Sequence, residues 1–191
     1  IINKTIIPHQ VEFQPGPQGK KICWLSCPYC YGESASNSEE RPSTERLVEV
    51  LNEIADGGVN KVTFAGWATD PLNSKSIDDL LQTAIQREMI FGFNTKPIRV
   101  SDKFVELLKE NKIHKDSWIS LSIDSGSNEI FNKVHGMNTK APLYDKILIN
   151  VLRIKEANKE YRKFDVSAAY LLNKFNSSKK EISKFMDDFK N

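Results

Sequence analysis

The residues with the clearest chemical potential are three cysteines that lie together near the start of the 191-residue chain. Cys23, Cys27 and Cys30 stand at positions i, i+4 and i+7, and the sequence contains no other cysteine. Thiolates at this spacing can converge on one metal centre, and a cubane iron–sulfur cluster accepts such ligands. Because the chain has no fourth thiolate, one iron of such a cluster would stay open to a ligand that is not a cysteine.

Two simpler interpretations of the cysteines stay open at this point. Residues three and four apart share one face of a helix, so the thiols could be buried in a core. Pro28 argues against that helix, because proline lacks the N–H donor and clashes with the preceding turn. Three cysteines and one histidine also make an ordinary structural zinc site. The histidines, His9, His114 and His135, are all remote from the cysteines in sequence.

The composition predicts one domain with a sizeable core, since 39% of the 191 residues are hydrophobic. Lys and Arg number 27 against 25 Asp and Glu, and a net charge of +2 gives no argument for nucleic acid or a membrane surface. No apolar run is long enough to cross a membrane, and the first residues do not resemble a secretory signal. Clustered cysteines suit a metal or redox site in the cytoplasm better than a disulfide framework.

Alternating strand and helix patterns predict five βα units in succession. Strands are expected at residues 11–13, 61–65, 89–93, 118–123 and 164–172. Helical stretches are expected around residues 47–55, 80–85, 104–108, 130–131, 143–154 and 182–189. Ser76 and Ser101 are candidate N-caps, and Ser178 with Glu181 fits a capping box.

This order predicts an α/β fold with a parallel sheet and right-handed crossovers. Such sheets place their sites at the carboxyl ends of the strands, in the βα loops. The cysteine segment directly follows the first expected strand, which is where this architecture would place a site.

The pattern C-x-x-x-C-x-x-C, with Tyr29 just before the last cysteine, resembles the signature of radical S-adenosylmethionine (radical SAM) enzymes. The resemblance implies that Cys23, Cys27 and Cys30 hold a [4Fe–4S] cluster and that SAM chelates the fourth iron. It further implies reductive cleavage of SAM to a 5′-deoxyadenosyl radical, which abstracts a hydrogen atom from a substrate. The cofactors supply that radical chemistry, and the protein supplies position and exclusion of competing reactions. The backbone of Tyr29 is expected to contact the adenine of SAM.

Three further segments resemble the family in the expected order. Residues 66–72 stand where the family binds the methionyl amine of SAM through a Gly-Gly-Glu-Pro stretch. Asp70-Pro71-Leu72 matches with a shorter acid, while Ala68 and Thr69 replace the usual glycines. The expected contacts in this segment are Gly66, Ala68, Thr69 and Asp70. A simple turn is the alternative, because Asp-Pro favours turn initiation.

The segment 120–126 resembles the family stretch that contacts the ribose or carboxylate of SAM. Ser122 and Asp124 are its candidate contacts, because period-two alternation would put both on one face of a strand. Ala168 lies in the expected fifth strand, which corresponds to the family strand that packs near adenine. Asn176 matches an Asn that peptide-modifying members often carry.

Other residues near these segments have weaker signals. Residues 93–96 replace a family Thr-Asn-Gly turn, and an ordinary loop is as good an interpretation as a ligand contact. Lys133 and His135 could reach a carboxylate, but solvated helix residues are the default there. The aromatic side chains of Trp24, Tyr31 and Trp67 fit burial near a cluster and substrate stacking equally well.

The resemblance implies a partial (β/α) barrel, and residues 1–191 are expected to form a single core domain of that type. The family uses six βα units, whereas five are visible here and the sixth strand is absent. We therefore expect a domain that is incomplete at its C-terminus. An unpaired parallel edge would be an association hazard.

The resemblance is strongest to peptide-modifying members, including maturases and epimerases of ribosomally made peptides. It implies a peptide substrate and an electron donor such as flavodoxin or ferredoxin. The alternatives are modification of a small molecule by the same chemistry, or a non-catalytic zinc-stabilised binding module. An epimerase would need a further thiol as hydrogen-atom donor, and the three cysteines leave none.

Overall fold

The structure is a computed structural model, and it describes residues 7–16, 23, 25–30, 42–66, 69–159 and 163–190. Its centre is a five-stranded parallel sheet in which the spatial order of the strands, β1-β2-β3-β4-β5, follows the sequence order. The strands are β1 (Val11–Phe13), β2 (Lys61–Phe64), β3 (Ile90–Thr95), β4 (Trp118–Ser122) and β5 (Asp165–Ala169). The predicted α/β class and parallel sheet are confirmed.

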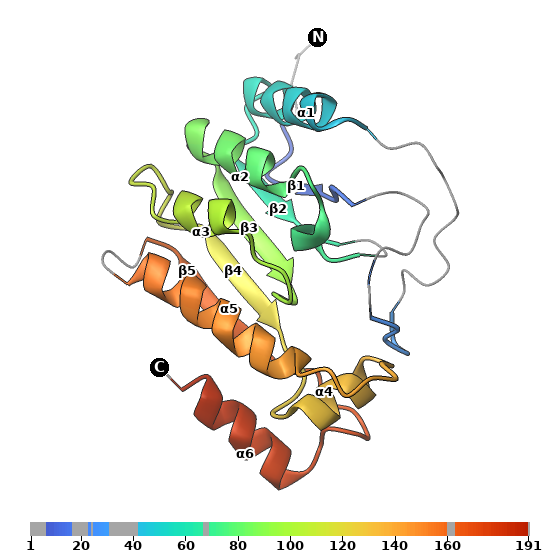
Figure 1. The fold of residues 1–191 in the computed structure, drawn as a ribbon. Helices are drawn as coiled ribbons and strands as arrows, with labels where there is room; N and C mark the ends of the chain where they lie inside the picture. Colours follow the sequence, from blue (N-terminus) through green and yellow to red (C-terminus); the bar gives the residue numbers. More distant parts are fainter. Residues whose placement is uncertain are drawn as a thin grey trace.

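Helices follow the strands, and four of them lie along one face of the sheet. The helices are α1 (Thr44–Asp56), α2 (Ile77–Gln86), α3 (Asp102–Leu107), α4 (Asn128–Val134), α5 (Leu143–Asn158) and α6 (Lys179–Asp188), with a short 3-10 helix η2 (Pro71–Asn73) before α2. Figure 1 shows α1, α2, α3 and α5 side by side over that face, and consecutive members of this row are in contact. The other face of the sheet carries none of these four helices, and we call it the open face.

Side-chain alternation along the strands separates the two faces. Phe64, Phe93 and Ile119 are fully buried and lie in adjacent strands at matching positions. Neighbours in register point to the same side of a parallel sheet, so these three share the helix-covered face. A stack of aromatic rings continues from there into α3, with Phe93 and Phe104 5.3 Å apart between ring centroids. Burial of this apolar row is the main force that holds the helices on the sheet.

Polar residues lie on the open face. The register pairs Asn94 with Ser120, and Ser120 with Ser167, all one residue away from positions on the helix-covered face. Ser122 pairs with Ala169 on the same side. The face that the helices leave uncovered is therefore lined by small hydroxyl and amide side chains towards the carboxyl ends of the strands, and one step nearer the amino ends the indole of Trp118 covers Gly92.

Most predicted helix starts are confirmed. The hydroxyls of Ser101 and Ser178 accept hydrogen bonds from the N–H groups of Phe104 and Glu181. Ser76 is different: it precedes α2 but makes no side-chain cap, and its hydroxyl instead lies 2.8 Å from that of Thr44. Ser76 therefore joins the first turn of α2 to the first turn of α1.

The predicted capping box at Ser178 forms only in part. The carboxylate of Glu181 is buried and accepts hydrogen bonds from the N–H of Gly126, at 2.5 Å, and from the hydroxyl of Ser127. Glu181 thus fastens α6 to the loop after β4 rather than completing its own helix cap. A local motif cannot anticipate this contact, because the partner is 55 residues away.

The fifth strand ends earlier than the sequence pattern predicts. Alternation suggests a strand up to residue 172, whereas β5 ends at Ala169. The reason is that the N–H of Leu171 donates to the carboxylate of Asp124, at 2.7 Å, and leaves the line of the sheet. This contact brings the loops after β4 and β5 together. Within the part of the chain that the structure describes, no helix is long and apolar enough to cross a membrane.

Candidate metal centre and cofactor site

The cysteine segment lies at the carboxyl end of the sheet, as predicted. Cys27 is buried, Cys23 and Cys30 are half-buried, and none of the three forms a disulfide. The N–H of Cys30 donates to the carbonyl of Cys27, at 3.0 Å, so Pro28 and Tyr29 occupy a turn between these two cysteines. The segment is therefore a loop, and the interpretation of the cysteines as one face of a helix is wrong.

Among the described residues, no three Cys, His, Asp or Glu side chains converge closely enough to hold one metal ion. In a cubane cluster each cysteine would bind a different iron. Burial, partly offset by the positive charge of Lys96, raises the pKa of Cys27 to about 11. Metal binding would replace that proton, because the thiolate is the form that binds iron.

The cysteine loop is held in place from the segment that follows α4. The N–H of Ser26 donates to the carbonyl of His135, at 2.9 Å. Gly136 has φ +63°, and a Cβ there would lie 2.2 Å from the carbonyl oxygen of Ser26. This close approach explains the glycine, because any side chain would push the cysteine loop away.

The loop after β2 places Asp70 beside the cysteine loop. A Cβ on Gly66 would lie 1.7 Å from the carbonyl oxygen of Thr69, so the turn between them requires glycine. Thr69 is nearly buried, whereas Trp67 and Ala68 lie outside the described residues. Ala68, expected to contact SAM, therefore stays a prediction.

The carboxylate of Asp70 is held by its own chain. It accepts hydrogen bonds from the N–H of Leu72 at 3.0 Å, the hydroxyl of Thr95 at 2.6 Å and the N–H of Lys96 at 2.6 Å. Burial nevertheless raises the pKa of Asp70 to about 6, against the effect of these donors. The first of these bonds caps η2, and the other two tie the loop after β2 to the end of β3.

A small hollow lies between Cys23, Asp70 and Lys96. Its volume is about 10 Å³, and Leu25, Asn73 and Ile98 complete the lining. This space holds a water molecule at most. It nevertheless shows that a cysteine and the expected SAM-binding loop border the same space.

Lys96 is the main residue of the site that the sequence pattern does not reveal. Its ammonium group donates to the carbonyl of Ser122 at 3.0 Å and to the carboxylate of Asp124 at 2.8 Å. Together with its N–H bond to Asp70, it joins the loops after β2, β3 and β4. One feature of the sequence could have indicated this role. Lys96 is a cation directly after β3, and the neighbouring strands β2 and β4 are each followed by an aspartate, Asp70 and Asp124.

Ser122 and Asp124 do not share one strand face, so that part of the prediction is wrong. β4 ends at Ser122, which lies half-buried on the open face. Asp124 follows with φ +62°, in the left-handed region that a non-glycine residue rarely adopts, so strand alternation does not extend to it. Its side chain is turned inward, and the residue is 3% exposed.

The carboxylate of Asp124 has many partners. Beside Lys96, it accepts hydrogen bonds from the N–H of Leu171 at 2.7 Å and from the hydroxyl of Tyr29 at 3.2 Å. Burial opposes its ionisation, but the facing imidazole of His135 and the charge of Lys96 outweigh burial and hold the pKa of Asp124 well below its usual range. Asp124 is therefore ionised and paired at neutral pH.

His135 is fully buried, so its expected place on a solvated helix surface is wrong. Its Nδ1 lies 2.8 Å from the carbonyl of Phe131, and its Nε2 lies 3.6 Å from the carboxylate of Asp124. Burial lowers the pKa of His135, with Asp124 acting in the opposite direction. Lys133 is exposed, as expected, and lies over the ring of Phe175.

The structure places Ala168 away from the open face. Ala168 pairs with Leu121 in register and lines a hollow of about 210 Å³ beneath α5, with Leu148 and Val151. The small residue that faces the open side at this level is Ala169, next to Ser122. Asn176 is fully buried and donates to the carbonyls of Asp124 and Leu171, so it fixes the loop after β5.

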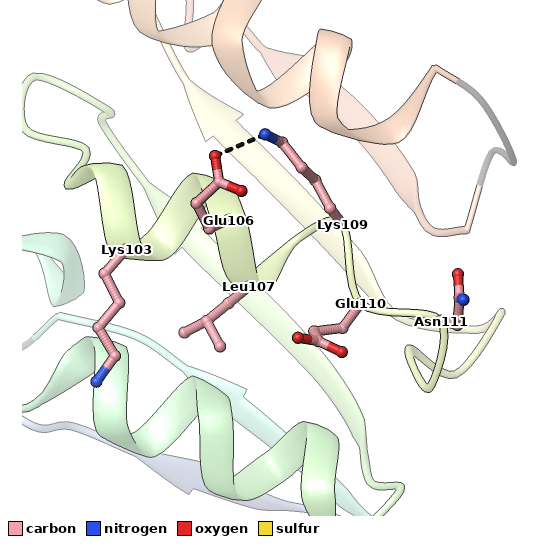
Figure 2. Close-up of a pocket in the computed structure, with 6 residues that line it drawn as sticks. All are labelled: Lys103, Glu106, Leu107, Lys109, Glu110 and Asn111. Atoms are coloured by element: carbon pink, nitrogen blue, oxygen red, sulfur yellow. Dashed lines mark hydrogen bonds and ion pairs between the residues drawn. The ribbon is translucent and has the colours of Figure 1, made fainter.

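Another hollow lies on the outer surface, beside α3 and the segment that follows it. Figure 2 shows its lining, with the ion pair between Glu106 and Lys109 at one side and Leu107 at its centre. These charged side chains are exposed, and the segment leads into the amino end of β4. The hollow therefore lies at the opposite end of the strands from the cysteine loop and has no part in that site.

Comparison with known proteins agrees with this geometry. Residues 20–184 match the radical SAM superfamily. An S-adenosylmethionine-dependent nucleotide dehydratase of Lacinutrix mariniflava is 35% identical over 128 residues, which are 63% of this chain and 25% of that protein. A probable GTP 3′,8-cyclase of Archaeoglobus fulgidus is 31% identical over 116 residues, which are 61% of this chain and 37% of that protein.

The fold also matches a solved structure over nearly its whole length. Streptococcus suis SuiB bound to its precursor peptide SuiA aligns with a TM-score of 0.68 and 18% identity, covering 95% of this chain and 36% of SuiB. The chain thus spans between a quarter and two fifths of the length of these relatives. The five-stranded sheet corresponds to part of the radical SAM barrel. The chain belongs to the radical SAM superfamily, a family of enzymes that use a [4Fe–4S] cluster and S-adenosylmethionine.

Proposed function

We propose that Cys23, Cys27 and Cys30 hold the [4Fe–4S] cluster of this radical SAM enzyme, and that residues 1–191 form one core domain in the cytoplasm. The observation that carries this proposal is a loop of three thiols, without disulfides, at the carboxyl end of a parallel sheet. When bound, the cluster and SAM supply a carbon radical that removes a hydrogen atom from the substrate. An electron donor such as a flavodoxin or ferredoxin belongs to the same proposal.

For SAM we propose contacts on the strand-end loops that surround the cysteines. Gly66, Ala68 and Thr69 belong to the loop after β2, and Ser122 faces the open side at the end of β4. The backbone of Tyr29 remains the proposed adenine contact. The carboxylates of Asp70 and Asp124 already accept three hydrogen bonds each from the chain, which favours a role in holding these loops.

As substrate we propose a peptide segment that lies against the open face. Towards the carboxyl ends of the strands, that face carries the neutral side chains of Asn94, Ser120 and Ser167, which suit the amide groups of a peptide backbone. Glu12 and Asp165 lie on the same face, one step nearer the amino end of the sheet, and Lys61 lies one step beyond them, so this part of the face carries charges of both signs. The match to the fold of SuiB, solved with a precursor peptide, supports the same class.

Among peptide modifications, we propose a cross-link within the substrate. Epimerisation must return a hydrogen atom to the substrate radical, and the proposed cluster occupies all three cysteines of residues 1–191. In a cross-link the substrate radical instead forms a bond to a second side chain, which loses a proton and passes one electron to an oxidised one-electron carrier such as ferredoxin. This route needs an electron acceptor but no thiol hydrogen donor. A hydrogen donor supplied from outside these residues would restore epimerisation.

A nucleotide is the second candidate, and the named sequence relatives favour it. The two relatives at 31–35% identity are named as a nucleotide dehydratase and a GTP cyclase. Their aligned segments cover at most 37% of their own length. The similarity to these two relatives therefore supports the shared radical chemistry more strongly than it supports a nucleotide substrate.

Transfer of deuterium separates the candidates. The full-length protein is reconstituted anaerobically with iron and sulfide, reduced, and given SAM with deuterated peptides in one series and deuterated nucleoside triphosphates in another. We expect 5′-deoxyadenosine that carries deuterium only in the peptide series, and none from the Cys27→Ser variant. Label from a nucleotide would favour the second candidate. A colourless protein that holds stoichiometric zinc and releases no deoxyadenosine would contradict the proposed cluster.

A further inference from the structure

The cysteine loop is joined to the SAM-binding side of the sheet through one buried carboxylate. Asp124 accepts hydrogen bonds from Tyr29 in the cysteine loop, from Lys96 after β3 and from Leu171 after β5. Its backbone carbonyl accepts a fourth hydrogen bond, from the amide of Asn176 at 2.8 Å. Contacts from segments that are far apart in sequence thus meet at one residue.

Tyr29 is well placed to transmit this anchoring to the thiols. It lies in the turn between Cys27 and Cys30, and its hydroxyl donates to Asp124 over a separation of 95 residues. Its ring also meets that of His135 edge to face, with 6.3 Å between the centroids. A change in the position of the phenol would therefore shift the turn that carries two of the three cysteines.

Lys96 extends the connection to the loop after β2. Its N–H binds Asp70 at 2.6 Å, and its ammonium group binds Asp124 at 2.8 Å. The two partners of the ion pair are nearly buried, with side chains 15% and 5% exposed. A buried pair is much less screened than a surface pair, and loss of one partner leaves the other uncompensated.

The alternative is that Asp124 contacts SAM directly. Its carboxylate already accepts three hydrogen bonds, and His135 Nε2 stands 3.6 Å from the same oxygen that Lys96 and Tyr29 bind. Oδ1 accepts only the Leu171 bond and keeps a free lone pair, but the side chain is 5% exposed and leaves little surface for a SAM hydroxyl to approach. The strained backbone at φ +62° also fits a residue whose orientation several contacts enforce.

We propose that Asp124 is a positioning residue: it links Lys96 to Tyr29 and thereby fixes the turn of Cys27 and Cys30 relative to the SAM-binding loops. We call the three residues Lys96, Asp124 and Tyr29 the strap. The inference rests on the proposed cluster site and names a residue role that the cysteine motif does not contain. Cys23 lies outside the strap and borders Lys96 across the small hollow.

The test uses Asp124→Asn and Tyr29→Phe in the full-length protein. Asn keeps the shape of the side chain but removes its charge, and Phe removes only the hydroxyl. Both variants should bind SAM about tenfold more weakly than the wild type when loaded with the cluster, as loss of a charge-assisted hydrogen bond implies. Both should also change the EPR signal of the reduced cluster with SAM. Because they break one connection, the double variant should be no weaker than the weaker single variant.

Hydrogen exchange tests the strap in protein that contains no cofactor. In the metal-free protein, the amides of residues 25–30 should exchange faster in both variants than in the wild type. Tyr144→Phe and Asp79→Asn are matched controls, since Tyr144 donates to Asp188 and Asp79 pairs with Lys103, both away from the cysteine loop. Neither control should change exchange in that loop or SAM affinity.

The outcomes separate the strap from the proposed function. Unchanged exchange of residues 25–30 in Tyr29→Phe would overturn the strap, even if Asp124→Asn fails to fold. A second outcome would also overturn the strap: only Asp124→Asn weakens SAM binding, and the effects of the two substitutions add in the double variant. Asp124 would then be a direct SAM ligand. A wild-type protein that loads no cluster contradicts the proposed function, and the strap is then decided by hydrogen exchange alone.

Discussion

The thiol of Cys27 has a measurable property that results from its burial. Because burial raises its pKa to about 11, it is protonated at neutral pH in the metal-free protein, and Lys96 only partly offsets that effect. The thiolate is the reactive form, so alkylation of Cys27 should be slow at pH 7 and rise about tenfold per pH unit until the pH approaches the pKa. Iodoacetamide labelling at several pH values, followed by mass spectrometry of the peptide, measures this rate.

The urea-unfolded protein is the control for this labelling. Unfolding exposes Cys27 and returns its pKa to the ordinary range, so its alkylation should become much faster at pH 7. Equal rates in the folded and unfolded protein at pH 7 would show that the thiol is not buried as described.

Asp70→Asn tests the hydrogen bonds that fix the loop after β2. An amide group cannot accept at both ends, so its NH₂ group would face either the N–H of Lys96 or the donors Leu72 and Thr95. An unsatisfied buried donor costs about 1–3 kcal/mol, so the free energy of unfolding should fall by about that amount. Urea unfolding measures it, with Asp116→Asn at an exposed position as control. A loss equal to that of the control would mean that the Asp70 bonds contribute little.

Residue roles were predictable where they depend on local pattern and were missed where they depend on distant partners. The position of Cys23, Cys27 and Cys30 after the first strand is set by spacing and by element order. In the sequence, Lys96 stands in what looks like an ordinary loop. Its partners Ser122 and Asp124 are 26 and 28 residues away, so the residues around Lys96 give no sign of these contacts. No local pattern reports a contact over that distance.

At the scale of elements, β3 and β4 meet at a point where only glycine fits. Gly92 and Trp118 are partners in register, and a Cβ on Gly92 would lie 2.3 Å from the indole ring. Gly92→Ala should therefore destabilise the protein by about 1–3 kcal/mol, the usual cost of overpacking. Thermal or urea unfolding measures the change.

Removal of the ring should reverse that loss. In the background of Trp118→Ala the space over Gly92 is empty, so adding Gly92→Ala should then cost little and could stabilise β3 by reducing the flexibility of the unfolded chain. The same loss in both backgrounds would show that the glycine is needed for another reason.

Element boundaries could be predicted only as far as local signals reach. The caps of α3 and α6 are predictable from Ser101 and Ser178, which stand directly before their helices. Ser76 stands at the N-cap position of α2 as predicted, but its missing side-chain cap and the early end of β5 have one physical reason. Thr44 and Asp124, each from another element, provide partners that outweigh the local preference.

At the scale of the whole molecule, element order was enough to predict the fold class. Repeated βα units lead to a parallel sheet, and the structure has one. The spatial order of its strands follows the sequence, which element order alone does not decide. The position of Ala168 shows the limit of the prediction. Which residues of β5 face the helices depends on the register with β4, and a shift of one residue exchanges the two faces.

The same sheet should have a gradient of stability from its centre to its edge. β3 pairs with strands on both sides, and its residues Phe91 and Phe93 are fully buried. Among the described strands, β5 pairs with β4 alone, and its residues alternate between exposed and half-buried. Backbone groups that open without exposing a core require less free energy than global unfolding.

Hydrogen exchange of the 191-residue chain should therefore be slowest in β3 and many-fold faster in β5. The amides of β3 can exchange only when the sheet and the aromatic row beneath α3 come apart, whereas those of β5 need only local opening at the edge. Peptide-resolved exchange at neutral pH, compared with the free energy of unfolding in urea, measures both. Protection of β5 equal to that of β3 would contradict the gradient, and it would mean that another strand or a second copy of the chain covers this edge. Dilution separates those two explanations, because only protection by a second copy depends on protein concentration.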